Sequence, residues 1–285
     1  MRWRELSDIV TAQPSEGGLV LVNDIADGMQ IGASFGELEL QPMGHTIIAA
    51  AHVSWAWRFR GTGVGSTVTP ESYRMFAQHL TFASEHVARA IAADANDGAA
   101  FAIGFRAHMG LSDIAGVYGG LRGYLLASRR PVSGLGAFAN AVSRKWLGTE
   151  EQALTFARQT AQIDLPASSG IVPYAHHVCW GARAIAAMHT SEPEPFAQYV
   201  TRDEVRADIL SANEAFASVA PDPDPFANWY ANASFSFALF SMNEINLARP
   251  HLSAMGEYVG GPWSDMDHPQ ETLDGVRRQL GMLSL

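Results

Sequence analysis

The 285-residue sequence predicts an all-α protein made of antiparallel helical hairpins. Its clearest pattern lies in residues 70–93, where apolar residues recur at spacings of four and three and so share one face of a helix, namely Phe76, Leu80, Ala83, Val87 and Ala90. Segments that begin near residues 98, 135 and 172 lie 37 residues apart, and each interval holds two predicted helices. Short turns rich in glycine and proline separate the helices, as antiparallel neighbours require.

A period of about 34–40 residues with a helical hairpin in each unit is typical of tetratricopeptide-like solenoids. The internal identity between the three intervals is poor, so any such repeats are degenerate. We therefore expect residues 45–285 to form one helical-repeat domain, a degenerate tetratricopeptide-like α-solenoid.

Residues 1–44 lack this pattern, and we expect them to form a short irregular or β N-terminal segment. The apolar run at residues 19–22 fits either a short strand or the start of a buried helix, because four residues cannot separate the two periods. Residues 35–40 alternate between apolar and other residues, which fits a strand, so a small hairpin is an alternative here.

Helix-start signals set several of the expected boundaries. Thr69 can cap a helix, with Pro70 in its first position and Glu71 at its positive end. Residues 149–152 and 201–204 have the capping-box form, and Ser112 is in place to cap another helix. Helices are expected over residues 45–59, 70–93, 98–109, 112–128, 135–146, 149–162, 172–188, 201–219, 226–240 and 243–259, and from residue 269.

Composition narrows the possible partners. The net charge is −10, and the 19 lysines and arginines are scattered, so we expect no nucleic acid to bind. Cys179 is the single cysteine, which excludes an intramolecular disulfide and a thiolate cluster within one chain. No histidine pair has the spacing of a zinc protease motif, and we expect neither a metal site nor a cofactor.

The sequence carries no sign of a membrane. No apolar run approaches the ~18–20 residues of a spanning helix, and the N-terminus has no apolar signal region, so we expect a cytoplasmic protein. Charged residues make up 17%, below the ~25% of typical soluble domains. This low fraction fits a large interior, or a surface committed to a partner, which includes a second copy of the chain in a homodimer.

Short motifs distributed over about residues 45–185 carry a family resemblance, and they lie at residues 55–61, 67–69, 76–80, 90–97, 145–151, 156–158 and 175–176. In these motifs the chain resembles a group of bacterial, chiefly actinomycete, tetratricopeptide-like proteins of unassigned function. That family usually has glutamate where Arg58 stands and Gly-Gly-Ser in place of residues 147–149. The resemblance implies helical hairpins stacked in a curved array, and it assigns no catalytic residue.

Two groups of residues are candidates for a binding site. Trp55 and Arg58 lie three apart on a predicted helix, and an indole beside a guanidinium can hold an anion or a planar ligand. Arg106 and Trp180 are further candidate substrate contacts. The alternative is that the tryptophans anchor the core and the arginines stabilise helix ends.

Histidines are the candidate acids and bases, and we name His108, His176 and His177. His176 and His177 precede Cys179, which a histidine base could activate as a nucleophile, although a cysteine in an apolar helix is usually a buried packing residue. The pairs His45/His52 and His79/His86 are each seven residues apart. That spacing is ~10 Å along a helix, too far for two ligands of one ion.

These observations leave two functions open. The favoured one is a binding or scaffold module that holds a protein, peptide or small molecule on the concave face of the array. The alternative is a cofactor-independent acid–base isomerase or cyclase of bacterial secondary metabolism, acting on an apolar or aromatic small molecule. In that case Phe235, Phe237 and Phe240 would line the far wall of its pocket.

Overall fold

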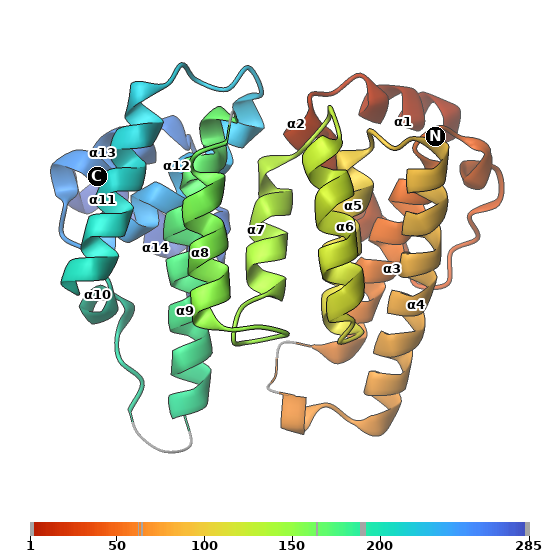
Figure 1. The fold of residues 1–285 in the computed structure, drawn as a ribbon, viewed down its shortest axis with the longest axis horizontal. Helices are drawn as coiled ribbons and strands as arrows, with labels where there is room; N and C mark the ends of the chain where they lie inside the picture. Colours follow the sequence, from red (N-terminus) through yellow and green to blue (C-terminus); the bar gives the residue numbers. More distant parts are fainter. Residues whose placement is uncertain (1–2, 62, 64, 164, 189–191, 283–285) are drawn as a thin grey trace. The chain divides into compact units, whose positions relative to one another are not determined.

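The structure is a computed structural model that describes residues 3–61, 63, 65–163, 165–188 and 192–282, without the side chain of Ser66. Over these residues the chain forms α-helices and short 3-10 helices and no β-strand, which confirms the predicted all-α class (Figure 1). No helix in this part of the chain has the length and apolar character that crossing a membrane requires.

The chain divides into two compact units, and the boundary falls between residues 141 and 142 rather than at residue 45. Within unit 1 the elements are α1 (Trp3–Thr11), α2 (Ser15–Gly28), η1 (Gly36–Leu40), α3 (Gly44–Arg60), η2 (Gly65–Thr67), α4 (Pro70–Ala93), α5 (Gly98–Gly110), α6 (Ile114–Leu126) and α7 (Val132–Ala141). Within unit 2 they are α8 (Glu150–Thr160), η3 (Pro166–Gly170), α9 (Ile171–Ala187), α10 (Phe196–Tyr199), α11 (Asp203–Ser218), α12 (Pro225–Ser241), α13 (Ile245–Ala254), η4 (Gly261–Asp265) and α14 (Pro269–Gln279).

The described part of the N-terminal segment, residues 3–44, contains α1, α2, η1 and the start of α3, so the prediction of an irregular or β segment over residues 1–44 was wrong. The apolar run at residues 19–22 lies inside α2, where Leu19 and Val22 are buried. The alternating residues 35–40 form the 3-10 helix η1, which buries Leu38 against the rest of unit 1. A four-residue apolar run fits a strand or a helix equally well, and tertiary packing selects the helix here.

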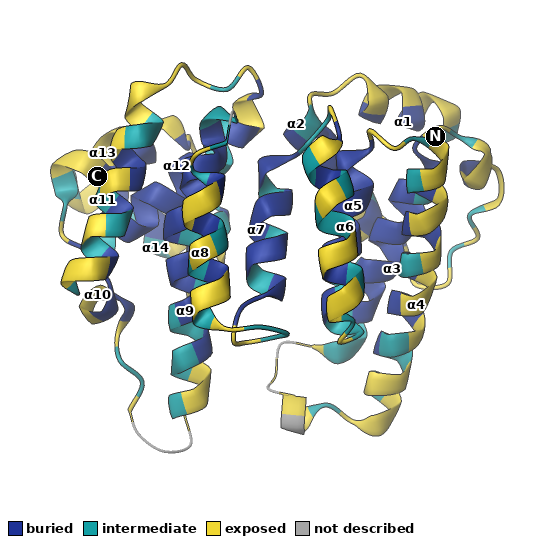
Figure 2. Cartoon of the chain, viewed as in Figure 1, coloured by how far each residue is buried: buried dark blue, intermediate teal, exposed yellow. Residues whose placement is uncertain are grey.

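Helix α3 is the central element of unit 1 and packs against α2, α4 and α5. It is buried along most of its length, whereas α4 exposes one face (Figure 2). The face of α4 that the sequence predicted is buried throughout, from Phe76 to Ala90. The α3–α4 hairpin is therefore held by apolar side chains at the expected helical spacing.

Two of the four caps predicted from the sequence, Thr69 and Thr149, are present, and Asp97 caps a further helix. The side chains of Thr69, Asp97 and Thr149 accept hydrogen bonds from backbone N–H groups in the first turns of α4, α5 and α8. Two predicted caps were wrong. Asp113, rather than Ser112, caps α6, and the Thr201 hydroxyl donates to the Gln198 carbonyl instead of capping α11.

The helix predicted over residues 135–146 begins and ends earlier, as α7. The chain turns after it, because the N–H groups of Trp146 and Gly148 both donate to the Ser143 carbonyl. A side chain at Gly148 would not fit, since a Cβ atom there would lie 2.2 Å from the Val142 carbonyl oxygen. This close turn, and not a change in apolar pattern, ends the helix.

Candidate functional site

The structure places the predicted site residues of α3 in packing and ion-pair roles. Trp55 is 1% exposed, and its indole N–H donates to the Met29 carbonyl at 3.2 Å. Arg58 is exposed and faces Asp27, at 3.9 Å from its carboxylate. Arg106 on α5 lies 3.5 Å from the side-chain oxygen of Asn23. These contacts agree with the packing alternative for Trp55 and give its indole no ligand-facing role.

His176 is fixed at both ring nitrogens in unit 2. It is 1% exposed, with Nδ1 3.1 Å from the Tyr199 hydroxyl and Nε2 3.2 Å from an Asp208 carboxylate oxygen. The hydrogen bond from His176, together with the neighbouring Arg158, lowers the pKa of Asp208 to about 2. Both nitrogens of the ring therefore hold internal partners, and the geometry assigns His176 to the interior of unit 2.

His177, the next candidate, lies among aromatic rings. Trp180, Phe196 and Phe237 surround it with ring centroids 5.3–5.6 Å away. Its Nε2 is 2.9 Å from Asp265, and its buried Nδ1 has no hydrogen-bond partner among the described residues.

Two neighbours of His177 have packing and hydrogen-bonding roles of their own. The Trp180 indole N–H donates to the Glu194 carbonyl at 2.7 Å. Burial raises the pKa of Cys179 to about 12, so its thiol stays protonated at neutral pH, and the predicted thiolate nucleophile is not favoured.

Replacement of His176 by phenylalanine is expected to lower the free energy of unfolding by about 1–2 kcal/mol, because the Tyr199 hydroxyl and the Asp208 carboxylate each lose a partner. Equilibrium urea unfolding of the full chain would measure this loss. Tyr199→Phe removes only one of the two contacts and should cost less. Unchanged stability of His176→Phe would contradict the structural role.

A groove in unit 1 contains His108, one of the predicted catalytic residues. Its volume is about 310 Å³, and three consecutive helices form it. The lining residues are Ser84, Val87, Ala88 and Ile91 of α4, Phe101, Gly104, Phe105 and His108 of α5, and Gly116, Gly119 and Gly120 of α6. Among the described residues the lining is mainly apolar, and His108 is its one ionisable side chain.

Glycines on α6 provide the room for this groove. At Gly119 an added Cβ would meet no atom within 4 Å, so the helix backbone borders open space there. At Gly120 an added Cβ would lie 3.2 Å from the Phe105 ring. At Gly116 it would lie 2.3 Å from Nδ1 of His108, so only glycine allows that ring to sit against α6. The groove thus depends on the absence of side chains along one face of a helix.

Asp113 orients the His108 ring. The carboxylate oxygen Oδ2 lies 2.9 Å from His108 Nδ1, and Oδ1 accepts the Gly116 N–H at 2.9 Å. The Gly116 hydrogen bond and His108 lower the pKa of Asp113, which keeps the carboxylate ionised. An ionised acceptor favours the proton on Nδ1 and leaves Nε2 as a hydrogen-bond acceptor or base.

The turn before α6 brings this pair together. Ser112 has a φ of 58° in the left-handed region, and it reverses the chain between the end of α5 and the cap of α6. His108 and Asp113 are five residues apart, a spacing that does not place two side chains together on one helix. The pair therefore depends on the turn.

The four histidines of the α3–α4 hairpin form a ladder that sequence analysis missed. His45 pairs with His86 and His52 with His79, with Nδ1–Nδ1 distances of 3.0 and 2.9 Å. Each step of seven residues along α3 is matched by seven residues back along α4, which is the register of an antiparallel hairpin. Burial lowers the pKa of His52 to about 4 and lowers those of the other three.

No metal centre accompanies these side chains in the part of the chain that the structure describes. Within it, no three His, Cys, Asp or Glu side chains are grouped so that they could hold a metal ion. The two pairs are joined, because the rings of His52 and His86 stack with centroids 6.0 Å apart, and we assign the histidine ladder to the packing of the hairpin.

Comparison with protein-family models, with curated proteins and with solved structures finds no match for this chain. The resemblance to actinomycete tetratricopeptide-like proteins therefore stays a prediction. We therefore infer the function from the groove and from the His108–Asp113 pair.

Proposed function

We propose that the chain is a binding protein for a small, mostly apolar molecule that lies in the α4–α5–α6 groove with its polar group against His108. One observation carries this proposal: a histidine that is oriented by a carboxylate lines an apolar groove of about 310 Å³. Pockets of ~300–1,000 Å³ with apolar walls and few polar groups are the usual form of small-molecule sites.

The lining predicts the chemistry of the ligand. Phe101 and Phe105 offer aromatic surface, which favours a flat or aromatic body. No carboxylate, lysine or arginine of the part of the chain that the structure describes lines the groove, so a charged ligand would find no counter-ion there, and a neutral molecule is favoured. An acceptor at Nε2 of His108 selects a ligand with a hydroxyl or N–H donor.

Fluorescence titration with 2-naphthol and naphthalene would test this proposal, because the two probes share an aromatic body and differ by one hydroxyl. We expect 2-naphthol to bind about fivefold to tenfold more tightly, through a hydrogen bond to His108. His108→Phe should bind both probes with equal affinity. Gly119→Leu, which adds bulk where a Cβ meets open space, should bind neither probe in the groove.

Two outcomes of this titration would contradict the proposal. One is equal affinity for the two probes in the unaltered chain. The other is undiminished binding by Gly119→Leu, which would place the probes elsewhere. Circular dichroism of each variant should match that of the parent, so that loss of binding is not loss of fold.

The wider form of the proposal is a helical-repeat module that holds a protein or peptide on a concave face, alone or as a homodimer. Its support is the packing of successive helices as pairs, α3 with α4, α5 with α6, α8 with α9 and α12 with α13. Stacked hairpins of this kind are the building units of a tetratricopeptide-like solenoid. Small-molecule binding that survives Gly119→Leu, or none at all, would favour this form.

An acid–base isomerase is a second candidate function, and the His108–Asp113 pair favours it. A neutral imidazole held by a carboxylate can remove a proton from carbon and return it elsewhere, without a cofactor. Incubation with small aromatic ketones in deuterium oxide would reveal this activity as deuterium at the carbon beside the carbonyl. Exchange that His108→Phe abolishes would show catalysis, and exchange equal in both proteins would exclude this role.

A further inference from the structure

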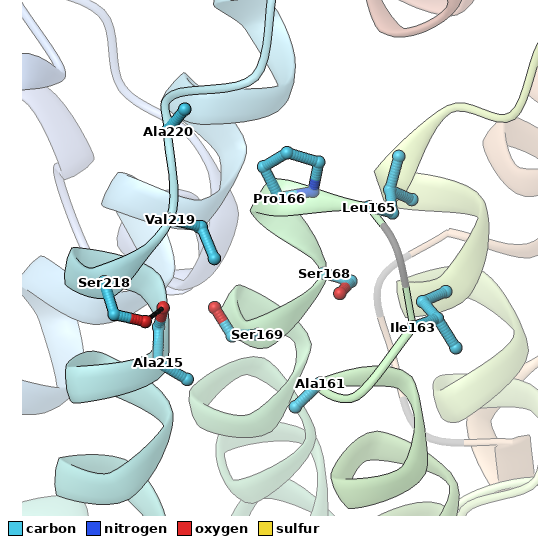
Figure 3. A pocket seen from close by; sticks show the side chains of 10 residues that line it. All are labelled: Ala161, Ile163, Leu165, Pro166, Ser168, Ser169, Ala215, Ser218, Val219 and Ala220. Atoms are coloured by element: carbon cyan, nitrogen blue, oxygen red, sulfur yellow. Dashed lines mark hydrogen bonds between the residues drawn. The ribbon is translucent and has the colours of Figure 1, made fainter.

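A second cavity lies in unit 2, where α8 and α11 end beside η3. Its volume is about 340 Å³. The residues that line it are Ala161, Ile163, Leu165, Pro166, Ser168, Ser169, Ala215, Ser218, Val219 and Ala220 (Figure 3). The wall combines small apolar side chains with three serine hydroxyls.

Ser169 is the unusual residue of this cavity. It is 3% exposed, and its hydroxyl has no hydrogen-bond partner among the described residues. Figure 3 shows its oxygen pointing across the cavity toward α11. A buried hydroxyl without a partner is destabilising, and native proteins leave few such groups. The Ser218 hydroxyl, in contrast, has a partner, because it donates to the Ala215 carbonyl of its own helix at 2.8 Å.

The fold holds Ser169 in this position. Its neighbour Gly170 packs directly on α12, where an added Cβ would lie 2.6 Å from the Cα atom of Ala231. Helix η3 also packs against α11 on the other side. The segment that carries Ser169 is therefore clamped between two helices, and a hydroxyl fixed in advance is what a binding site needs.

The electrostatics of the cavity favour a neutral ligand. No ionisable side chain of the described residues lines it, so a buried charge would find no counter-ion among these residues. The C-terminal ends of α8 and α11 both border it, and helix C-termini carry partial negative charge. Anions are disfavoured most, and hydrogen-bond donors of a neutral molecule are favoured.

We propose that this cavity is a second ligand site, which holds a small neutral molecule with a hydroxyl or amide group bonded to Ser169. The Ser169 hydroxyl can both donate and accept, so it can bond to either group. The apolar residues around it would contact the body of the molecule. This site lies wholly in unit 2, and its existence does not depend on the groove of unit 1.

Four probes with one aromatic body would test the site in ¹H–¹⁵N spectra of the full chain: benzyl alcohol, benzamide, benzylamine and benzoate. We expect the two neutral probes to shift the signals of residues 168–170 and 215–220, and the two ions to bind at least about tenfold more weakly. Ser169→Ala should lower the affinity for the neutral probes about fivefold to tenfold. Ser218→Ala, the matched serine whose hydroxyl is already bonded, should change affinity by less than about twofold.

A thermal melt without probe separates this proposal from a structural water on Ser169. If the hydroxyl has no partner in the absence of ligand, its removal costs no hydrogen bond, and Ser169→Ala should melt at the same or a higher temperature than the parent. A lower melting temperature together with no response to the neutral probes would overturn the proposal. Tightest binding of benzoate, or equal binding by parent and Ser169→Ala, would overturn it too. Gly119→Leu serves as the control for the groove and should leave this site unchanged.

Discussion

Between pH 6.5 and 4 the free energy of unfolding of unit 1 is expected to fall by up to about 3 kcal/mol less when His52 is replaced by asparagine. Burial, with the nearby His79 and His86, lowers the pKa of His52 from 6.5 to about 4. Over that range the unfolded chain binds a proton at this residue that the folded chain does not. The free energy of unfolding therefore falls as the pH falls below about 6.5, and the loss from this group is complete below about 4.

Urea unfolding at a series of pH values, from about 7 to about 4, would measure this dependence. Asparagine stays neutral throughout, so His52→Asn should show a shallower decline than the parent even if its stability near neutral pH is lower. His268→Asn, which changes an exposed histidine outside the ladder, is the matched control and should follow the parent. Parallel curves for the parent and His52→Asn would contradict the account of the histidine ladder.

Alanine at Gly116 and alanine at Gly119 are expected to change the stability of unit 1 in opposite directions. At Gly116 the new Cβ would lie 2.3 Å from His108 Nδ1 and 2.4 Å from Asp113 Oδ2, so the pair must separate, at a cost of about 1–3 kcal/mol. At Gly119 it meets nothing within 4 Å, and the better helix former should add about 0.5–1 kcal/mol. We expect the two variants to differ by about 3 kcal/mol.

The same urea series at neutral pH would test this difference. Gly275→Ala on α14 is the control, because a Cβ there also meets open space, and it should be stabilising like Gly119→Ala without altering the groove. Equal stabilities for the Gly116 and Gly119 variants would mean that His108 and Asp113 are not held against α6.

Much of the fold was predictable because its signals are local. Thr69 and Thr149 cap the helices that their sequences indicate, since a cap needs only the residues of the first turn. The caps predicted at Ser112 and Thr201 were wrong because each site has a competing hydrogen bond. A neighbouring aspartate supplies the cap of α6, and the Thr201 hydroxyl finds an acceptor behind it in the chain.

The candidate sites were less predictable, because they depend on contacts between helices. The spacing of seven in both histidine pairs was visible, but their pairing needs the register of α3 against α4. His108 was a candidate because histidine is a common acid or base. The groove beside it could not be predicted, because it forms only where the glycines of α6 pack near α4 and α5. Nothing local distinguishes Ser169 from Ser168. The buried, unpartnered state of the Ser169 hydroxyl is seen only in the folded unit, where η3 packs against α11 and α12.

The most direct test of the central claim, that the groove binds a small molecule through His108, is the ¹⁵N spectrum of the His108 ring with and without 2-naphthol. We predict that Nδ1 carries the proton in both states, that the Nε2 signal shifts on binding, and that amide shifts gather in α4, α5 and α6. The Gly119→Leu variant should show none of these changes. An unchanged His108 ring in the presence of bound 2-naphthol, or the same shifts in Gly119→Leu, would contradict the proposal.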